Sequence, residues 1–223
     1  MKIRYSIRPR GLAGAAVALA ALLLLGACAS PSPAPVLISL PPVPRPDAVA
    51  NAAAAPAAPA ASAPAADLPV LAVRRVGIPE YLVSRRVRYR ADPSTLAEWP
   101  NTYWAERIEI GVTREFTSAL RAQLPGWSLC ESNCGDRGPV LALNVDIVPM
   151  DFARAGGQLR ARARIVVNAT AGLARVLQTQ ERDYTIAANG DTAQAMAQAV
   201  SDLIAQVAAQ SAALIRATPA PAR

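Results

Sequence analysis

The sequence predicts an α+β domain in which two helices pack on a single, largely antiparallel sheet of about five strands, in the order β-β-α-β-β-β-α. Several segments place apolar residues at every second position, which is the period of a half-buried strand. Two longer segments repeat apolar residues every four positions, as amphipathic helices do. Residues 68–215 carry this patterning and have the normal size of one domain.

The first half of this region predicts two strands and a helix. Val70–Val76 is apolar apart from two arginines, and Tyr81–Arg90 alternates apolar and polar residues. Asp92-Pro93-Ser94 predicts a turn. A helix is expected from about Tyr103 to Leu124, with Pro125-Gly126 ending it. Its apolar stripe consists of Trp104, Ile108, Val112, Phe116 and Leu120.

The second half predicts a hairpin, a further strand and a second helix. Val140–Val148 and Leu159–Val167 both alternate, on either side of a turn at Gly156-Gly157. Arg175–Ile186 is more polar and is expected at the edge of the sheet. The second helix, Thr192–Ile215, carries one charge. Either another copy of the chain covers its outer face, which would give a homo-oligomer, or the helix is simply rich in alanine.

The N-terminus has the three-part layout of an export signal. Basic residues precede an uncharged apolar stretch, Leu12–Leu25, and small residues follow it. The apolar stretch is shorter than the ~20 residues that a membrane-spanning helix needs. The basic residues are Lys2, Arg4, Arg8 and Arg10.

The run Leu25-Gly26-Ala27-Cys28 resembles the lipobox of bacterial lipoproteins. That resemblance implies cleavage between Ala27 and Cys28 and lipidation of Cys28 with two or three acyl chains, enough for stable anchoring. Ala29 stands where retention in the inner membrane would favour Asp, so we expect the periplasmic face of the outer membrane. The alternatives are an ordinary secretory signal with an incidental cysteine and an uncleaved anchor helix.

Composition argues against two classes of function. The formal charge of the 223 residues is +7, and it falls to +3 without residues 1–27, which hold four basic residues and no acidic ones. Basicity therefore gives no reason to expect a nucleic-acid partner. The chain has no His, the commonest general base and transition-metal ligand. With no catalytic motif or phosphate-binding loop in sight either, we expect no enzyme activity, cofactor or metal.

Two further cysteines, Cys130 and Cys134, lie close together in the sequence. An exported domain occupies an oxidising compartment, which favours a structural disulfide between them. The bridge would close a five-residue loop and contribute about 2 kcal/mol through the entropy of the unfolded chain. A redox dithiol is the alternative, although its usual spacing is two residues. Two thiolates without His offer too few ligands for a metal.

Arginines alternate along two of the predicted strands. They would form a partner surface, for acidic headgroups or an acidic protein, if both rows lay on one sheet face. The alternative is an ordinary solvated face. The six residues are Arg86, Arg88, Arg90, Arg160, Arg162 and Arg164.

Residues 41–67 are dominated by Pro and Ala and are expected to be disordered. The apolar Val36–Leu40 before them is either a strand or part of a tether. If it is a strand, residues 28–35 form the tether, 36–215 form a domain with 41–67 as an insert, and 216–223 form a tail. The extended Ala29–Pro35 would then reach about 25 Å. If it is not, the tether has some 39 residues, Ala29–Asp67, and the domain roams more freely.

The mature chain resembles the ABC-type transport auxiliary lipoproteins, the PqiC-like family. The resemblance rests on Val76-Gly77-Ile78-Pro79-Glu80-Tyr81-Leu82, Arg88-Tyr89-Arg90, Trp104-Ala105-Glu106 and the later Phe116, Leu120 and Leu124. The family shows V-x-x-P-x-Y-L-D-R and W-A-E-P-L at these places. Val83-Ser84 and Arg107-Ile108 depart from those patterns.

The resemblance implies a docking subunit anchored in the outer membrane within an intermembrane lipid-transport system. Its partners would be a periplasmic substrate-binding protein of the MCE type and, through it, an inner-membrane permease and ATPase. The alternative is a structural envelope lipoprotein that binds peptidoglycan or assists assembly of the outer membrane.

Overall fold

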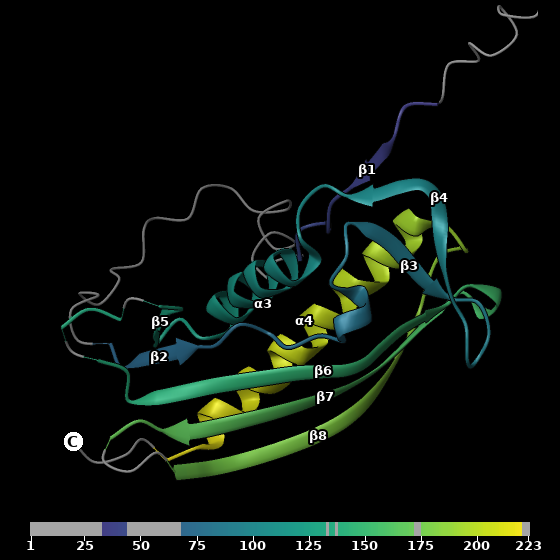
Figure 1. Ribbon diagram of the computed structural model, residues 1–223. Coiled ribbons are helices and arrows are strands. Elements are labelled where there is room, and N and C mark those ends of the chain that lie inside the picture. The colour runs from purple at the N-terminus through teal and green to yellow at the C-terminus, as the bar shows by residue number, and fades with distance from the viewer. Residues whose placement is uncertain (1–32, 44–67, 133, 137, 172–174, 220–223) are drawn as a thin grey trace, which may run out of the picture. The chain divides into compact units, whose positions relative to one another are not determined.

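A computed structural model of the protein describes residues 33–43, 68–132, 134–136, 138–171 and 175–219. The predicted export signal, Cys28 and residues 44–67 lie outside the described residues. From Pro35 onward the chain forms one unit, which holds the sheet and both helices described below (Figure 1).

Within the described residues the sheet contains eight strands and mixes parallel with antiparallel pairs, so the expectation of about five, largely antiparallel strands is wrong. The predicted hairpin is present and longer than expected, and in the described part of the chain the polar third strand pairs with its predecessor alone, at the sheet edge. The strands are β1 (Val36–Ile38), β2 (Val70–Val73), β3 (Arg86–Arg90), β4 (Leu96–Trp104), β5 (Ser128–Cys130), β6 (Leu141–Ala153), β7 (Gln158–Ala169) and β8 (Arg175–Ala187).

The additional strands lack the alternation that marks a half-buried strand. β1 and β5 are three residues long, too short for a period-two pattern to be recognised. β4 contains Pro100 and Asn101, and Asn101 has a positive φ of 51°. Pro and Asn are both common in turns, so the sequence of this segment does not indicate a strand. The first part of the predicted Tyr81–Arg90 strand is a 3₁₀ turn, η2 (Glu80–Leu82).

β6 is the strand on which the sheet is built. One edge pairs with β7 from end to end, whereas the other pairs with β2 at Leu71↔Leu141 and then with β3 at Arg90↔Ala153. Between the two partners the chain stays alongside β6, where Gly77 forms a parallel bridge with Asp146. A Cβ at Gly77 would lie 2.2 Å from Asp146 Oδ1, so a larger residue here would require the Asp146 side chain to move.

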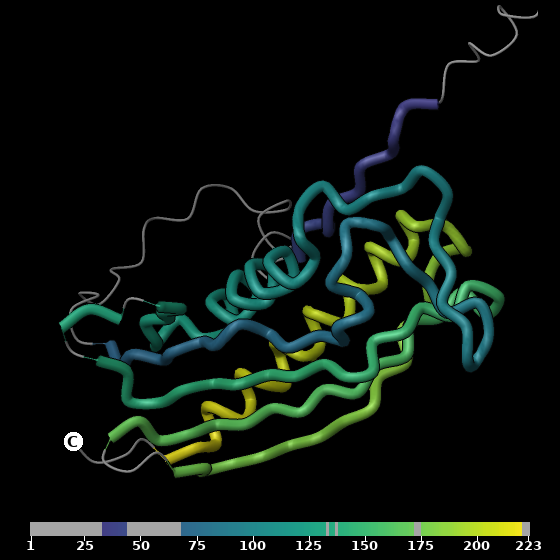
Figure 2. The backbone as a smooth tube through the Cα atoms, in the orientation of Figure 1, coloured from purple at the N-terminus to yellow at the C-terminus, as the bar shows by residue number. Residues whose placement is uncertain are grey.

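Two helices, α3 (Ile108–Gln123) and α4 (Ala193–Ala217), pack against each other, and α4 also packs on β7 and β8. Figure 2 shows α4 running across the long strands β6, β7 and β8. α3 begins at Ile108 rather than Tyr103, because Tyr103 and Trp104 belong to β4. Its predicted stripe is buried throughout.

The scarcity of charge on α4 has an explanation within one copy of the chain. The helix is buried on the side facing the sheet and on the side facing α3, so that residues as far apart around it as Ala199, Ser201 and Ile204 are almost inaccessible. Its exposed strip is narrow and is largely glutamine and alanine. A helix covered on two sides has little surface on which charges can be solvated.

The N-terminal segment is integrated into the fold. β1 pairs in parallel with β4, placing Ile38 opposite Trp104. Of the two alternatives for this segment, the structure therefore shows the strand. Beyond β1, Leu40 is buried beside Gly111, where a Cβ would lie 3.4 Å from Leu40 Cδ1.

Two polar contacts continue the attachment after Leu40. Ser201 Oγ on α4 donates a hydrogen bond to the Pro41 carbonyl at 2.7 Å. The backbone N–H of Val43 donates to Glu115 Oε2 on α3 at 3.4 Å. The segment is thus held by both helices, and these contacts give the buried Ser201 and Glu115 polar partners.

Replacing Leu40 by Ala should lower the free energy of unfolding by about 2–5 kcal/mol, because a core leucine would leave a cavity. Leu37→Ala is the matched control, since Leu37 is 60% exposed and Leu40 is 6% exposed. The control should stay within about 0.5 kcal/mol of the wild type. Denaturant unfolding of the mature protein measures both, and equal effects would contradict the burial of Leu40.

Candidate functional site

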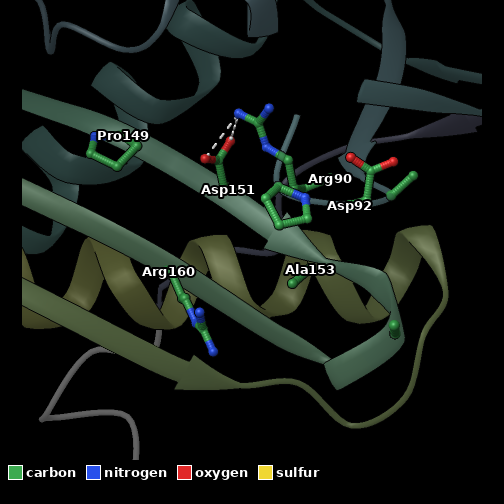
Figure 3. Close-up of a pocket in the computed structure, with 9 residues that line it drawn as sticks. Arg90, Asp92, Pro149, Asp151, Ala153 and Arg160 are labelled. Carbon is green, nitrogen blue, oxygen red and sulfur yellow. Dashed lines mark hydrogen bonds and ion pairs between the residues drawn. The ribbon is translucent and has the colours of Figure 1, made fainter. Parts of the chain in front are cut away.

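A pocket of about 430 Å³ opens where β6 changes partner from β2 to β3. Asp151 and Arg160 are directly paired across β6 and β7, while their neighbours Phe152, Leu159 and Ala161 are buried in the core. Because successive side chains of a strand point to opposite faces, the pocket lies on the sheet face away from the core (Figure 3). Its lining is Arg90, Ala91, Asp92, Pro93, Pro149, Asp151, Ala153, Ala155 and Arg160.

A bulge in β6 shapes one wall of the pocket. The register with β7 shifts between Ile147 and Met150, so β6 holds one residue more than its partner there. Val148 and Pro149 are both exposed as a result. Pro149 lacks an N–H group, and a bulge is one of the few places in a sheet where this is tolerated.

Tyr81, Arg90 and Asp151 form a hydrogen-bonded group beside the pocket. Arg90 Nη2 donates to Asp151 Oδ1 at 2.9 Å and to Oδ2 at 3.0 Å, and Tyr81 Oη donates to Oδ1 at 2.8 Å. The Arg90 guanidinium also lies 5.5 Å from the Tyr81 ring centroid, within the range of a cation–π contact. The three residues join η2, β3 and β6, and so fix the side of the pocket that β3 forms.

The pKa values of this group follow from its contacts. Partial burial, together with the hydrogen bond to Asp151 and its negative charge, raises the pKa of Tyr81 from 10.0 to about 12. The hydrogen bond to Asp151 raises the pKa of Arg90 as well. Tyr81 is therefore a neutral donor and Arg90 a fixed cation at every physiological pH.

The structure brings only part of the two arginine rows together. Arg90 of β3 and Arg160 of β7 line the same pocket. Most of the six arginines have carboxylate partners, so the surface carries both signs of charge. The ion pairs are Arg86 and Arg88 with Glu98, Arg90 with Asp151, and Arg162 with Asp183 and Glu181. Among the described residues, Arg160 and Arg164 have no such partner.

The cysteines divide between described and undescribed parts of the chain. A disulfide joins Cys130, at the end of β5, to Cys134. Ala27 and Cys28, where cleavage and lipidation are expected, lie outside the described residues. In the described ranges, no three His, Cys, Asp or Glu side chains come close enough to hold a metal ion. Neither helix there combines the length and apolar character needed to cross a membrane.

Sequence reasoning missed Asp151 and gave no role to the Tyr81 hydroxyl. Asp151 is hydrogen-bonded to Arg90 across a sequence separation of 61 residues, and a separation of this size leaves no local pattern. Pro149 is the available signal, because a proline within a strand-like run indicates a bulge or an edge. Tyr81 is half-buried, and its hydroxyl rather than its ring defines its role.

Tyr81→Phe should remove a tyrosine ionisation near pH 12 from the ultraviolet absorbance titration of the folded protein. Because the pKa in the folded state exceeds the ordinary 10.0, Tyr81 stabilises the fold fully below pH 10 and loses this contribution as the pH rises towards 12. The wild type should lose more stability than Tyr81→Phe over this interval. An unchanged titration curve in the variant would contradict the assignment.

Comparison with known proteins assigns the chain to a family. No match was found among curated proteins. The crystal structure of an uncharacterized protein has a TM-score of 0.61 and 19% identity over 82% of this chain and 99% of the other. A Xanthomonas campestris protein has a TM-score of 0.51 and 16% identity over 64% and 80% of the two chains. Residues 31–212 match the model of the ABC-type transport auxiliary lipoprotein component, and the chain belongs to that family.

Proposed function

We propose that the protein is a non-catalytic docking subunit of an intermembrane lipid-transport system, anchored at the periplasmic face of the outer membrane. Its partners would be an MCE-type periplasmic substrate-binding protein and, through it, an inner-membrane permease and ATPase. The observation that carries the proposal is the family match over residues 31–212.

The position of β1 supports a short attachment to the membrane. Cys28 would carry the lipid, and β1 begins at Val36. The seven residues between them, 29–35, span at most about 25 Å when extended. Since the segment up to Val43 is held by α3 and α4, the Pro/Ala-rich residues 44–67 would add nothing to this reach. The domain would stay close to the outer membrane, and its partner would have to approach it.

Cys28→Ser should abolish incorporation of labelled fatty acid and remove the protein from the outer-membrane fraction. The matched control is the double variant Cys130→Ser with Cys134→Ser, which removes the disulfide and should keep the label. Metabolic labelling and membrane fractionation give both readouts. Retention of the label by Cys28→Ser would contradict lipidation at this residue.

Mild crosslinking of intact cells, followed by capture of the tagged protein, should recover an MCE-type protein. Capture of the Cys28→Ser variant should recover much less MCE-type protein, because the lipid anchor would hold the domain at the outer membrane, which the partner has to reach. Recovery of peptidoglycan fragments or outer-membrane assembly proteins without an MCE-type protein would instead support a structural envelope role and contradict the proposal.

A further inference from the structure

We propose that the pocket between β3, β6 and β7 binds an apolar side chain accompanied by a carboxylate, presented by an extended segment of a partner protein. The inference rests on the proposed function only for the identity of that partner. The location of the site and the kind of side chains it binds are inferred from the chemistry and geometry of the described residues.

The pocket suits an apolar side chain because its walls are rigid and largely apolar. Much of the lining comes from alanine and proline, whose side chains have little or no freedom to rotate into the space. The pocket therefore exists before any ligand arrives, and about 430 Å³ suits one or two side chains. The residues concerned are Ala91, Pro93, Pro149, Ala153 and Ala155.

The carboxylate is expected because Arg160 is the cation of the lining that has no carboxylate partner among the described residues. Asp151 is hydrogen-bonded to Arg90 and to Tyr81. Asp92 Oδ1 accepts hydrogen bonds within its own turn, from the N–H groups of Ser94 and Thr95 at 2.9 Å. Arg160 has no hydrogen bond or ion pair among the described residues, although it lies in the pocket. A guanidinium pairs strongly with a carboxylate, in a bidentate geometry where the ligand allows it.

The arrangement in the pocket keeps the expected ligand charge away from Asp92. Figure 3 shows Asp92 and Arg160 apart from each other in the lining, with the Arg90–Asp151 pair to one side of the space between them. A carboxylate bound to Arg160 would therefore meet a neutralised pair rather than a free acid. The apolar side chain would occupy the space over Pro149 and Ala153.

The surroundings favour a polypeptide over a membrane surface. Next to the pocket, the sheet face carries cross-strand pairs of opposite charge, Arg164 opposite both Asp146 and Glu181, and Arg162 opposite Asp183. All five side chains are exposed. An anionic membrane would be repelled by these carboxylates, whereas a protein segment can match a mixed pattern of charge. Exposed Val148 extends the apolar surface along β6.

Arg160→Glu should weaken binding of the periplasmic region of the MCE-type protein from the same bacterium by at least about tenfold. The matched control is Arg164→Glu on the same strand and face, which lies outside the pocket and, like Arg160, makes no ion pair among the described residues, although Asp146 and Glu181 stand opposite it. The control should remain within about twofold. Ala155→Trp, a change at an exposed lining residue that fills the pocket, should also weaken binding. The full lipidated protein in detergent is used, and circular dichroism checks its fold.

Equal losses for Arg160→Glu and Arg164→Glu would overturn the proposal, because they would indicate diffuse electrostatic attraction. The proposal would also be overturned if either Arg160→Glu or Ala155→Trp bound the MCE-type protein as tightly as the wild type does. If the wild type binds the MCE-type protein and all three variants bind it equally well, the proposed function would stand and the pocket would be refuted as the binding site.

A second probe separates the pocket from the identity of the partner. The dipeptide acetyl-Leu-Glu-amide, titrated to millimolar concentration, should shift the nuclear magnetic resonance signals of the lining residues, and acetyl-Leu-Gln-amide should do so much less. Arg160→Glu should abolish the difference. This result would support the pocket even if the MCE-type protein failed to bind. Absence of any shift, or binding to anionic phospholipid vesicles that depends on Arg160, would overturn the proposal.

Discussion

The burial of Leu40 fixes the place at which the N-terminal segment joins the domain. Leu40 packs beside Gly111, Ser201 holds the next carbonyl, and β1 extends the sheet before it. Helices α3 and α4 therefore both contact this N-terminal segment in addition to packing against each other. With the lipid on Cys28 as proposed, residues 29–35 would form a short link, separate from the Pro/Ala-rich residues 44–67.

The second organising feature is the change of partner along β6. One long strand carries β2 and β5 at one end and β3, β4 and β1 at the other, with β7 along its whole opposite edge. The bulge at Val148 and Pro149 lies between these partners, and the pocket opens beside it. The same strand thus connects the pocket, through β3 and β4, to the N-terminal strand β1.

Sequence reasoning succeeded where burial imposes a local period. The hairpin of β6 and β7 and the stripe of α3 are buried on one face, which forces alternation or a repeat of four. It failed for β4 and β5, whose pairing is set by distant segments and, in β4, passes through Pro100 and Asn101, and it left β1 as one of two alternatives. The arginines of the pocket were identified from their alternation, but Asp151 was not, because its partner Arg90 is remote in the sequence.

The proposed short link is tested most directly by moving one insertion. About 20 residues of Gly and Ser, which add roughly 25 Å of root-mean-square length, are inserted after Ser30 or, in a matched variant, after Ala54. Crosslinked capture of the MCE-type partner from cells is compared with the wild type. The insertion after Ser30 should reduce capture sharply, and the insertion after Ala54 should leave it unchanged. Equal effects of the two insertions would contradict a link that ends at β1.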